Sequence, residues 1–479
     1  MRHDLDRRQF LRHVGLSLAG LSVSGCSEAA KTAARRSVGG RPNIIYILAD
    51  DLGYGDLGCY GQAKIKTPNI DRMAAEGMRF TQHYSGSTVC APSRCCLMTG
   101  LHTGHAYIRG NREIQPEGQE PIRADTVTVG KLLKRAGYIT GMVGKWGLGS
   151  PGSEGVPNRQ GFDYFFGHLC QREAHFYYPP HLWRNEEKIV LEGNDRKKQT
   201  GRYSHDLMTD EVLAFIRRNK ARPFFLYVPY TIPHAELAVP EDSLSQYEGK
   251  FPEKPFPGNH YGAQPRPHTV FAAMVSRLDR DVGKILALLR ELRIDDRTLV
   301  MFTSDNGPHR EGGADPGFFQ SSGPLRGIKR DLYEGGIRVP LVARWPGKIG
   351  PHTVSHHVSA FWDFLPTACE LAGVKSPEGI DGISMMPTLL GGPAKQQKHK
   401  FLYWEFHERG SKQAVRMGRW KAVRFGTGGK LELYDLDNDI GEANDVAAEQ
   451  PEIVAKIEAY LVEARTESKF WNLSESARR

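Results

Sequence analysis

The sequence is poor in the features that mark several large classes of protein. Only seven of its 479 residues are cysteine, and they show no repeated spacing of a disulfide framework or a zinc knuckle. No run approaches the ~20 apolar residues that a helix needs to cross a bilayer, so we do not expect a polytopic membrane protein. Lysine and arginine are spread along the chain without the interleaved aromatic residues of a nucleic-acid binder, and there is no internal repeat. We therefore expect no nucleic-acid partner.

The composition is typical of a large globular protein. Hydrophobic residues make up 39% and charged residues 25%, with 52 glycines and 29 prolines, which predicts a loop-rich chain with a substantial core. The length is about three times that of a typical domain, so we expect one large domain and a smaller one. The formal charge of +9 favours anionic substrates by long-range attraction, although such a charge on a long chain is equally compatible with a role in solubility alone.

The beginning of the chain has the character of an export signal. Arg7 and Arg8 precede an apolar stretch over residues 14–23, which resembles a twin-arginine signal, and Cys26 follows Val-Ser-Gly as in a lipobox. A disordered tail with chance arginines is the alternative. The first interpretation predicts export by the twin-arginine route and a periplasmic or cell-surface lipoprotein that meets the membrane only through its anchor. The predicted parts are a signal over residues 1–25, a lipid anchor at Cys26 and a flexible tether over residues 26–40.

Buried strands and amphipathic helices alternate through the middle of the chain. Continuous apolar runs predict strands buried on both faces, as in a parallel sheet, at residues 43–49, 138–143, 223–228 and 298–303. Helical periodicity predicts intervening helices after Thr67-Pro68, after an Asp125 cap, and over about 204–220 and 269–292. The alternation predicts an α/β fold with a large, mostly parallel central sheet between helices, over residues 41–395.

The pattern changes near residue 396. Short alternating runs predict antiparallel strands at residues 401–406, 413–417, 420–425 and 431–435, joined by glycine-containing turns, and a helix follows over 451–464. We therefore predict a small C-terminal α+β domain with an antiparallel sheet over residues 396–479.

Acidic and amide side chains follow two of the predicted parallel strands. Asp50 and Asp51 come directly after one strand, and Asp305 and Asn306 after another. In open α/β sheets, ligands collect beyond the carboxyl ends of the strands. Three carboxylates and an amide are oxygen ligands for a hard divalent ion, and calcium tolerates irregular geometry better than magnesium. The sequence thus predicts one calcium ion, although Asp50 taken alone could equally be a cap or a solvated loop acid.

The segment from Cys90 to Gly100 reads Cys-Ala-Pro-Ser-Arg-Cys-Cys-Leu-Met-Thr-Gly. It resembles the signature of the type I, formylglycine-dependent sulfatases of the alkaline phosphatase superfamily. The resemblance implies an alkaline phosphatase-like fold and oxidation of Cys90 to formylglycine by a formylglycine-generating enzyme. One hydroxyl of the hydrated aldehyde would attack sulfur, and the other would collapse to the aldehyde and expel sulfate. We also expect Pro92 at a first helical position, which would set Cys90 at a helix N-terminus, where free N–H groups favour an anion.

The resemblance extends from about residue 42 to 445 and implies further site residues. Arg94 matches the motif arginine that holds the formylglycine hydroxyl and the metal-site carboxylates. Lys145 and Lys329 match the two lysines that grip sulfate oxygens, and His234 looks like the histidine near the leaving oxygen. Each of these residues taken alone is more often a surface or packing residue, but as an ordered series they reinforce one another.

One position departs from the family pattern. Many relatives read Gly-Lys-Trp-His-Leu-Gly where this chain has Gly147 in place of the histidine, which is usually assigned as the base for sulfate expulsion. His175 and His105 are candidates to re-enter the site, although a core or surface role is an alternative for each. Arg172, in the aromatic and basic stretch 171–183, suits a sugar-binding rim.

These observations favour an exported, calcium-dependent sulfatase that hydrolyses a sulfate ester, and we expect the ester to be on a sulfated carbohydrate. Two alternatives stay open at this point. A phosphonate or phosphate ester hydrolase of the same superfamily would bind a similar tetrahedral anion. A non-catalytic lipoprotein that binds sulfated glycans would explain Gly147 and an export route that delivers unmodified Cys90.

Overall fold

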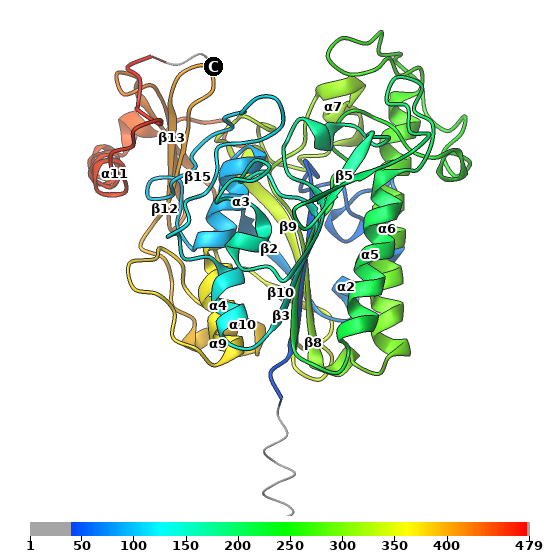
Figure 1. Cartoon of the computed structure of the whole chain (residues 1–479). Coiled ribbons are helices and arrows are strands. Elements are labelled where there is room, and N and C mark those ends of the chain that lie inside the picture. The colour runs from blue at the N-terminus through cyan, green and yellow to red at the C-terminus, as the bar shows by residue number, and fades with distance from the viewer. Residues whose placement is uncertain (1–39, 477–479) are drawn as a thin grey trace, which may run out of the picture. The chain divides into compact units, whose positions relative to one another are not determined.

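The computed structural model describes residues 40–476, so the predicted export signal, the anchor at Cys26 and the tether up to residue 39 lie outside the described residues. From residue 42 onward the chain forms one compact unit (Figure 1). None of the helices in the described part combines the length and the apolar character that a bilayer crossing requires.

One large sheet of 11 strands organises this unit, in the order β10-β2-β9-β8-β1-β7-β3-β4-β5-β6, with β11 paired to β2. Its central strands β8, β1, β7, β3 and β4 run parallel, and β9, β5 and β6 add antiparallel neighbours. The predicted large, mostly parallel sheet is confirmed. The strands are β1 (Asn43–Ala49), β2 (Met78–Tyr84), β3 (Ile139–Lys145), β4 (Tyr164–His168), β5 (His181–Arg184), β6 (Glu187–Val190), β7 (Phe224–Pro229), β8 (Thr298–Ser304), β9 (Arg338–Arg344), β10 (Thr353–Ser355) and β11 (Ser359–Ala360).

Helices cover both faces of this sheet (Figure 1). Residues 44, 46 and 48 of β1 pack into a core with α3, α4 and α9, whereas residues 45, 47 and 49 pack into a second core with α2, α5 and α6. Both faces of β1 are therefore apolar, which explains its continuous hydrophobic run. The helices are α2 (Pro68–Ala75), α3 (Cys90–Thr99), α4 (Val129–Arg135), α5 (Ser204–Asn219), α6 (Pro267–Glu291), α7 (Pro316–Phe319), α8 (Glu334–Ile337), α9 (Phe364–Ala372), α10 (Met386–Leu389) and α11 (Pro451–Glu463).

Two helix starts differ from the sequence expectation. Helix α4 is capped by Thr128, whose side chain accepts the backbone N–H three residues further on at 3.2 Å, and not by Asp125, which pairs with Arg123. Helix α3 begins at Cys90 itself, so Pro92 is its third residue rather than its first. The missing N–H of proline is tolerated at either place, because the first N–H groups of a helix have no intrahelical acceptor.

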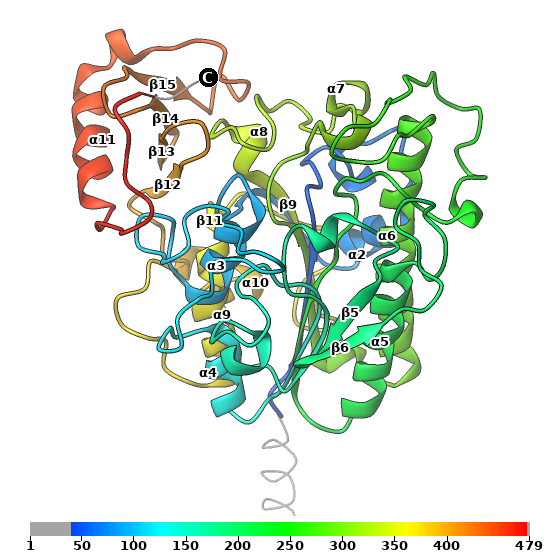
Figure 2. The same cartoon turned by 45° about the horizontal axis from the view of Figure 1, so that its top comes forward.

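A second, antiparallel sheet of four strands follows in the order β12-β13-β14-β15, and α11 packs on it through Tyr403, Val415, Ile457 and Leu461 (Figure 2). The predicted small α+β part with an antiparallel sheet is confirmed. Its strands are β12 (Leu402–Phe406), β13 (Lys412–Met417), β14 (Trp420–Phe425) and β15 (Leu431–Asp435). A domain boundary between residues 395 and 396 stays a prediction, because both sheets belong to the same compact unit.

Candidate active site

The carboxylates meet because β1 and β8 are parallel neighbours that end at the same level. Ala49 pairs with Ser304, so the next residues of both strands lie side by side. The Asp51 backbone N–H donates to Asp305 Oδ1 at 3.1 Å, and Asn306 Nδ2 donates to Asp51 Oδ1 at 2.7 Å. The structure therefore brings all four predicted oxygen ligands together in a buried cluster, which consists of Asp50, Asp51, Asp305 and Asn306.

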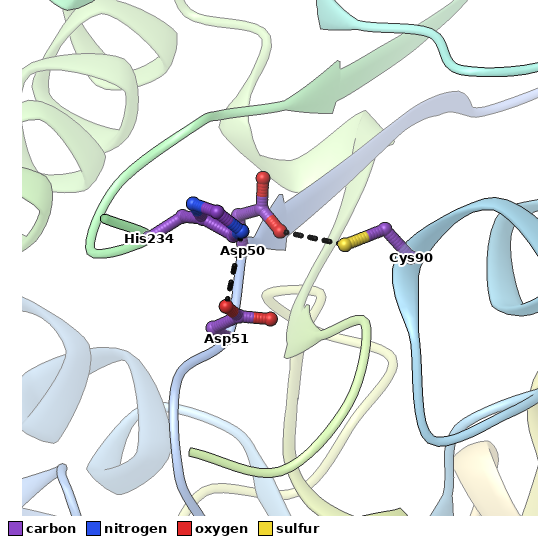
Figure 3. A group of neighbouring side chains, drawn as sticks. All are labelled: Asp50, Asp51, Cys90 and His234. Carbon is purple, nitrogen blue, oxygen red and sulfur yellow. Dashed lines mark hydrogen bonds and ion pairs between the residues drawn. The ribbon is translucent and has the colours of Figure 1, made fainter. Parts of the chain in front are cut away.

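Cys90 faces this cluster from the first residue of α3. Its Sγ lies 3.3 Å from Asp50 Oδ1, and Figure 3 shows the thiol pointing toward that carboxylate. Burial raises the pKa of the Cys90 thiol well above its usual value, and the charge of Asp50 adds to the shift. Arg94 lies one turn further along α3 and donates to Asp305 Oδ2 at 2.6 Å and to the Lys145 carbonyl at 2.6 Å. The motif cysteine and arginine thus contact the same group of carboxylates.

Two buried lysines reach the cluster from distant parts of the chain. Lys145, the last residue of β3, places Nζ 2.6 Å from Asp50 Oδ2. Lys329 places Nζ 2.8 Å from Asp51 Oδ2 and 3.2 Å from Glu311 Oε2. Burial would lower the pKa of each lysine, but the surrounding negative charge, to which the adjacent aspartate contributes most, outweighs burial in sum and raises the pKa. Both ammonium groups are therefore charged and lie where they can bind an anion.

Two histidines stack beside Lys329. His234 Nε2 lies 3.1 Å from Lys329 Nζ and 3.3 Å from Asp51 Oδ2. The His175 ring stacks on it with centroids 4.4 Å apart and an interplanar angle of 16°. Burial and the charge of Lys329 lower the pKa of His234 to about 4, while burial and His234 lower the pKa of His175 well below its usual value. Both imidazoles are neutral near pH 7, and His175 does re-enter the site region.

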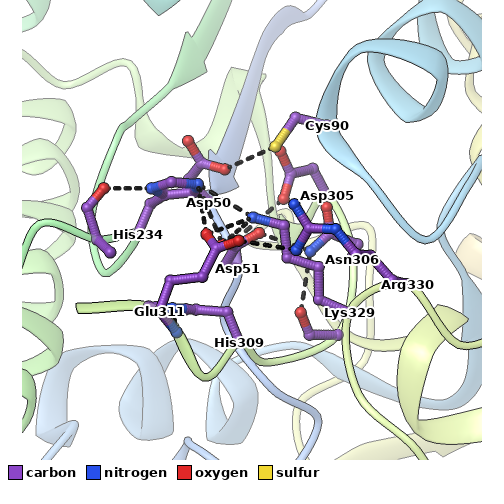
Figure 4. A network of polar contacts seen from close by, with 12 residues as sticks. Asp50, Asp51, Cys90, His234, Asp305, Asn306, His309, Glu311, Lys329 and Arg330 are labelled. Carbon is purple, nitrogen blue, oxygen red and sulfur yellow. Dashed lines mark hydrogen bonds and ion pairs between the residues drawn. The ribbon is translucent and has the colours of Figure 1, made fainter. Parts of the chain in front are cut away.

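The structure adds residues that the sequence interpretation missed. Glu311 accepts from Lys329 and pairs with Arg330 at 2.7 Å, and the His309 ring stacks at 5.6 Å on His234 (Figure 4). His309 and Glu311 lie in a loop shortly after the predicted metal ligands at the end of β8, and that closeness in the sequence was the available signal. Charged residues in a loop are common, so the spacing alone did not single them out.

Two predicted residues lie elsewhere. His105 follows the far end of α3 and binds Asp381 through Nδ1 at 2.9 Å, with its ring stacked on His102. Arg172 is partly exposed and pairs with Glu113 at 2.7 Å. No contact described for either residue involves the cluster around Cys90, so His105 does not replace the missing side chain at position 147.

The oxygen cluster has features that fit a divalent cation. Asn306 Oδ1 is buried and has no hydrogen-bond donor among the described residues. Burial and the charge of Asp50 raise the pKa of the Asp305 carboxyl to about 7, whereas nearby cations lower the pKa of Asp50 and Asp51, so Asp305 is the least easily ionised of three crowded carboxyl groups. An orphan oxygen acceptor and crowded carboxylates are the donor set of a hard metal ion. This buried acidic cluster could therefore bind a metal.

Comparisons with known proteins agree with this geometry. The model of the sulfatase family matches residues 42–374, and that of the N-sulphoglucosamine sulphohydrolase C-terminal region matches residues 328–467. The chain is 34% identical over 432 residues to N-acetylgalactosamine-6-sulfatase of Canis lupus familiaris, covering 85% of this chain and 74% of the relative. It is 33% identical over 459 residues to arylsulfatase A of Homo sapiens, covering 88% and 82%.

A solved structure is similar over an equally large part of the fold. The crystal structure of Ps i-CgsB in complex with k-i-k-neocarrahexaose superposes with a TM-score of 0.75 at 28% identity, and the match covers 91% of this chain and 95% of that one. The family match spans most of the chain, and the motif cysteine, the arginine, both lysines and the carboxylates of the predicted site converge at one end of the sheet. The chain therefore belongs to the sulfatase family and is a sulfuric ester hydrolase.

Proposed function

We propose that this sulfatase hydrolyses a sulfate ester of a carbohydrate at the Cys90 cluster. The observation that carries the proposal is the convergence of two buried ammonium groups, Lys145 and Lys329, with Cys90 and the oxygen cluster. Two charged donors that meet the same cluster suit a tetrahedral anion. The names of the relatives support a sugar, since they include an N-acetylgalactosamine-6-sulfatase and a structure with a bound neocarrahexaose.

The proposal includes conversion of Cys90 to formylglycine by a formylglycine-generating enzyme. A cysteine is nucleophilic as its thiolate, and the raised pKa of the buried Cys90 thiol keeps it protonated near pH 7. The unmodified thiol is therefore a poor nucleophile in this position. The hydrated aldehyde would supply a hydroxyl nucleophile there.

Calcium is the proposed metal, held by Asp50, Asp51, Asp305 and Asn306. It would supply positive charge that polarises the sulfate group. Lys145 and Lys329 would each donate to a sulfate oxygen, and Arg94 would keep Asp305 oriented. His234 holds its ring by an Nδ1 contact to the Ala235 carbonyl, so Nε2, which faces Lys329, is the atom that would exchange a proton with the leaving oxygen.

The decisive experiment combines mass spectrometry with an assay. The tryptic peptide that contains residue 90 should carry the mass of formylglycine. The protein should release 4-nitrophenol from 4-nitrophenyl sulfate much faster than from 4-nitrophenyl phosphate or a 4-nitrophenyl phosphonate monoester. Cys90→Ala should fold normally and lose this activity. Sulfate release by Cys90→Ala, or a preference for the phosphorus esters, would contradict the proposal.

Metal dependence gives an independent test. Dialysis against a chelator should abolish turnover of 4-nitrophenyl sulfate, and calcium should restore it better than zinc, because the site offers oxygen donors. Asp305→Asn should weaken the calcium response, while Asp125→Asn, at an exposed acid outside the cluster, serves as its matched control. Rescue by zinc alone would contradict the calcium assignment.

We also propose export by the twin-arginine route and a lipid anchor at Cys26, supported by the order of Arg7, Arg8 and the following apolar stretch. Arg7→Lys combined with Arg8→Lys should leave precursor in the cytoplasm. Cys26→Ala should release the protein from membranes or block its processing. Normal membrane fractionation of both variants would argue against a periplasmic or cell-surface lipoprotein.

A further inference from the structure

Gln171 is a buried side chain whose hydrogen-bonding groups are unused. It is 6% exposed, and neither Nε2 nor Oε1 has a hydrogen-bond partner among the described residues. An unsatisfied buried polar group destabilises the free protein, so such a group needs an explanation. A polar ligand that satisfies both atoms when it binds would provide one.

Gln171 occupies the space that a side chain at position 147 would fill. Gly147 has φ of +79°, and a Cβ built on it would lie 2.3 Å from Gln171 Nε2 and 3.0 Å from its Cδ. The segments after β3 and β4 run side by side here, since the Gly147 N–H donates to the Leu169 carbonyl at 3.0 Å. The Gln171 amide can occupy this space because position 147 is glycine, and a larger residue at position 147 would displace the amide.

This arrangement borders the catalytic cluster. Lys145, whose ammonium group binds Asp50, precedes Gly147 by only two residues. The segment that carries Gln171 continues to His175, whose ring stacks on His234 and whose backbone carbonyl accepts from the Glu236 N–H at 2.9 Å. The unpartnered amide thus lies in a segment that contacts the chain just after Lys145, a proposed sulfate lysine, and that leads to His175, a histidine of the site.

We propose that Gln171 is a substrate-binding residue that recognises both the sulfate group and the sugar. Nε2–H donates to a sulfate oxygen, which can only accept, and Oε1 accepts from a sugar hydroxyl near the ester. This inference rests on the proposed function, because it names the part of a sulfated carbohydrate that this amide contacts. A ligand with both an acceptor and a donor fits better than a bare anion, which would leave Oε1 unsatisfied.

The chemistry of the amide also limits its role. A carboxamide does not take up a proton near neutral pH, so Gln171 binds and orients the substrate rather than replacing the imidazole as a base. In the surrounding segment, His168 Nε2 and His175 Nδ1 have no partner among the described residues, and the His175 ring stacks on His234. Proton exchange therefore belongs to the imidazoles of the site, and Gln171 contributes binding.

The test compares Gln171→Leu and Gln171→Glu with a matched control, Gln160→Leu. Gln160 is also buried, but its Nε2 donates to the carbonyls of Glu154 and Arg123. We measure kcat and KM on 4-nitrophenyl sulfate and on N-acetylgalactosamine-6-sulfate, the rise of Tm with inorganic sulfate, and Tm without ligand. Gln171→Leu should raise KM for the aryl ester about 10- to 100-fold, which is the effect of losing one hydrogen bond to a charged group. KM for the sugar ester should rise several-fold more, because the hydrogen bond to the sugar hydroxyl is lost as well.

Two comparisons separate binding from a structural role. Gln171→Glu should have a higher KM than Gln171→Leu, because it adds a negative charge beside the sulfate. A role in packing alone predicts the reverse order. Without ligand, Gln171→Leu should keep or raise Tm, while Gln160→Leu lowers Tm and leaves KM unchanged. An unchanged KM together with an unchanged sulfate-induced rise of Tm in Gln171→Leu would overturn the inference. A higher KM in Gln171→Leu than in Gln171→Glu would also overturn it.

The same design keeps the two proposals apart. If the wild type hydrolyses no sulfate ester, the proposed function fails, but the sulfate-induced rise of Tm in the wild type and in Gln171→Leu still decides whether the amide binds the anion. If the wild type hydrolyses 4-nitrophenyl sulfate and the Gln171 variants match it on both esters, the proposed function stands and the inference fails.

Discussion

Replacing Gly147 with histidine would restore the residue that many relatives carry, yet the structure predicts a loss rather than a gain. At φ of +79°, a residue with a Cβ costs about 1–2 kcal/mol more than glycine. Its Cβ would also approach Gln171 Nε2 to 2.3 Å, so the amide must move, and overpacking a filled site costs about 1–3 kcal/mol. We therefore expect Gly147→His to lower the free energy of unfolding by about 2–5 kcal/mol and to raise KM by displacing Gln171.

Urea unfolding and steady-state kinetics on 4-nitrophenyl sulfate measure both effects. Gly147→Ala should lose most of the free energy of unfolding that the positive φ costs, without adding an imidazole. Adding Gln171→Ala to Gly147→His should recover the part of the stability lost to the clash, but not the part due to φ. Faster turnover by Gly147→His at unchanged stability would refute this reasoning, because it would mean that the space at position 147 is free and that the base is simply missing.

The remaining predictions concern charge. Lys145→Met and Lys329→Met should each lower kcat/KM by roughly 10² to 10³, the scale of one preorganised charge contact in a transition state, and wild-type rates in both would show that these lysines do not touch the substrate. Burial alone would raise the pKa of Glu405, but the hydrogen bond from His407 and the charge of Arg109 lower it to about 2. Because the folded-state pKa is lower than the unfolded one, this contribution of up to about 3 kcal/mol is present above pH ~4.5 and is lost as pH falls toward 2. The difference in free energy of unfolding between wild type and Glu405→Gln, measured in urea, should therefore decrease from pH 5 to pH 3. A constant difference would contradict the ionisation of Glu405.

Local sequence patterns predicted the elements whose burial is uniform. The runs at residues 43–49 and 298–303 are apolar throughout because helices cover both faces of the sheet, and the structure has β1 and β8 there. Strand β2 was not predicted, because its residues Met78–Tyr84 include polar side chains and are neither buried throughout nor regularly alternating, since the pairing register shifts between Phe80 and His83. The cap of α4 was misplaced because aspartate and threonine are both good caps, and only the observed hydrogen bond distinguishes them.

The sequence by itself determined the chemistry that lies within a few residues of a recognisable pattern: the acids at two strand ends, the segment from Cys90 to Arg94, and the lysine at the end of β3. These follow from the local chain, because parallel strands bring their carboxyl ends together. Only the tertiary structure decided that Glu311 binds Lys329, that His175 rather than His105 stacks on His234, and that Gln171 fills the space beside Gly147. Those contacts join loops from different strands, and their positions depend on packing between segments far apart in the sequence, which no local spacing encodes.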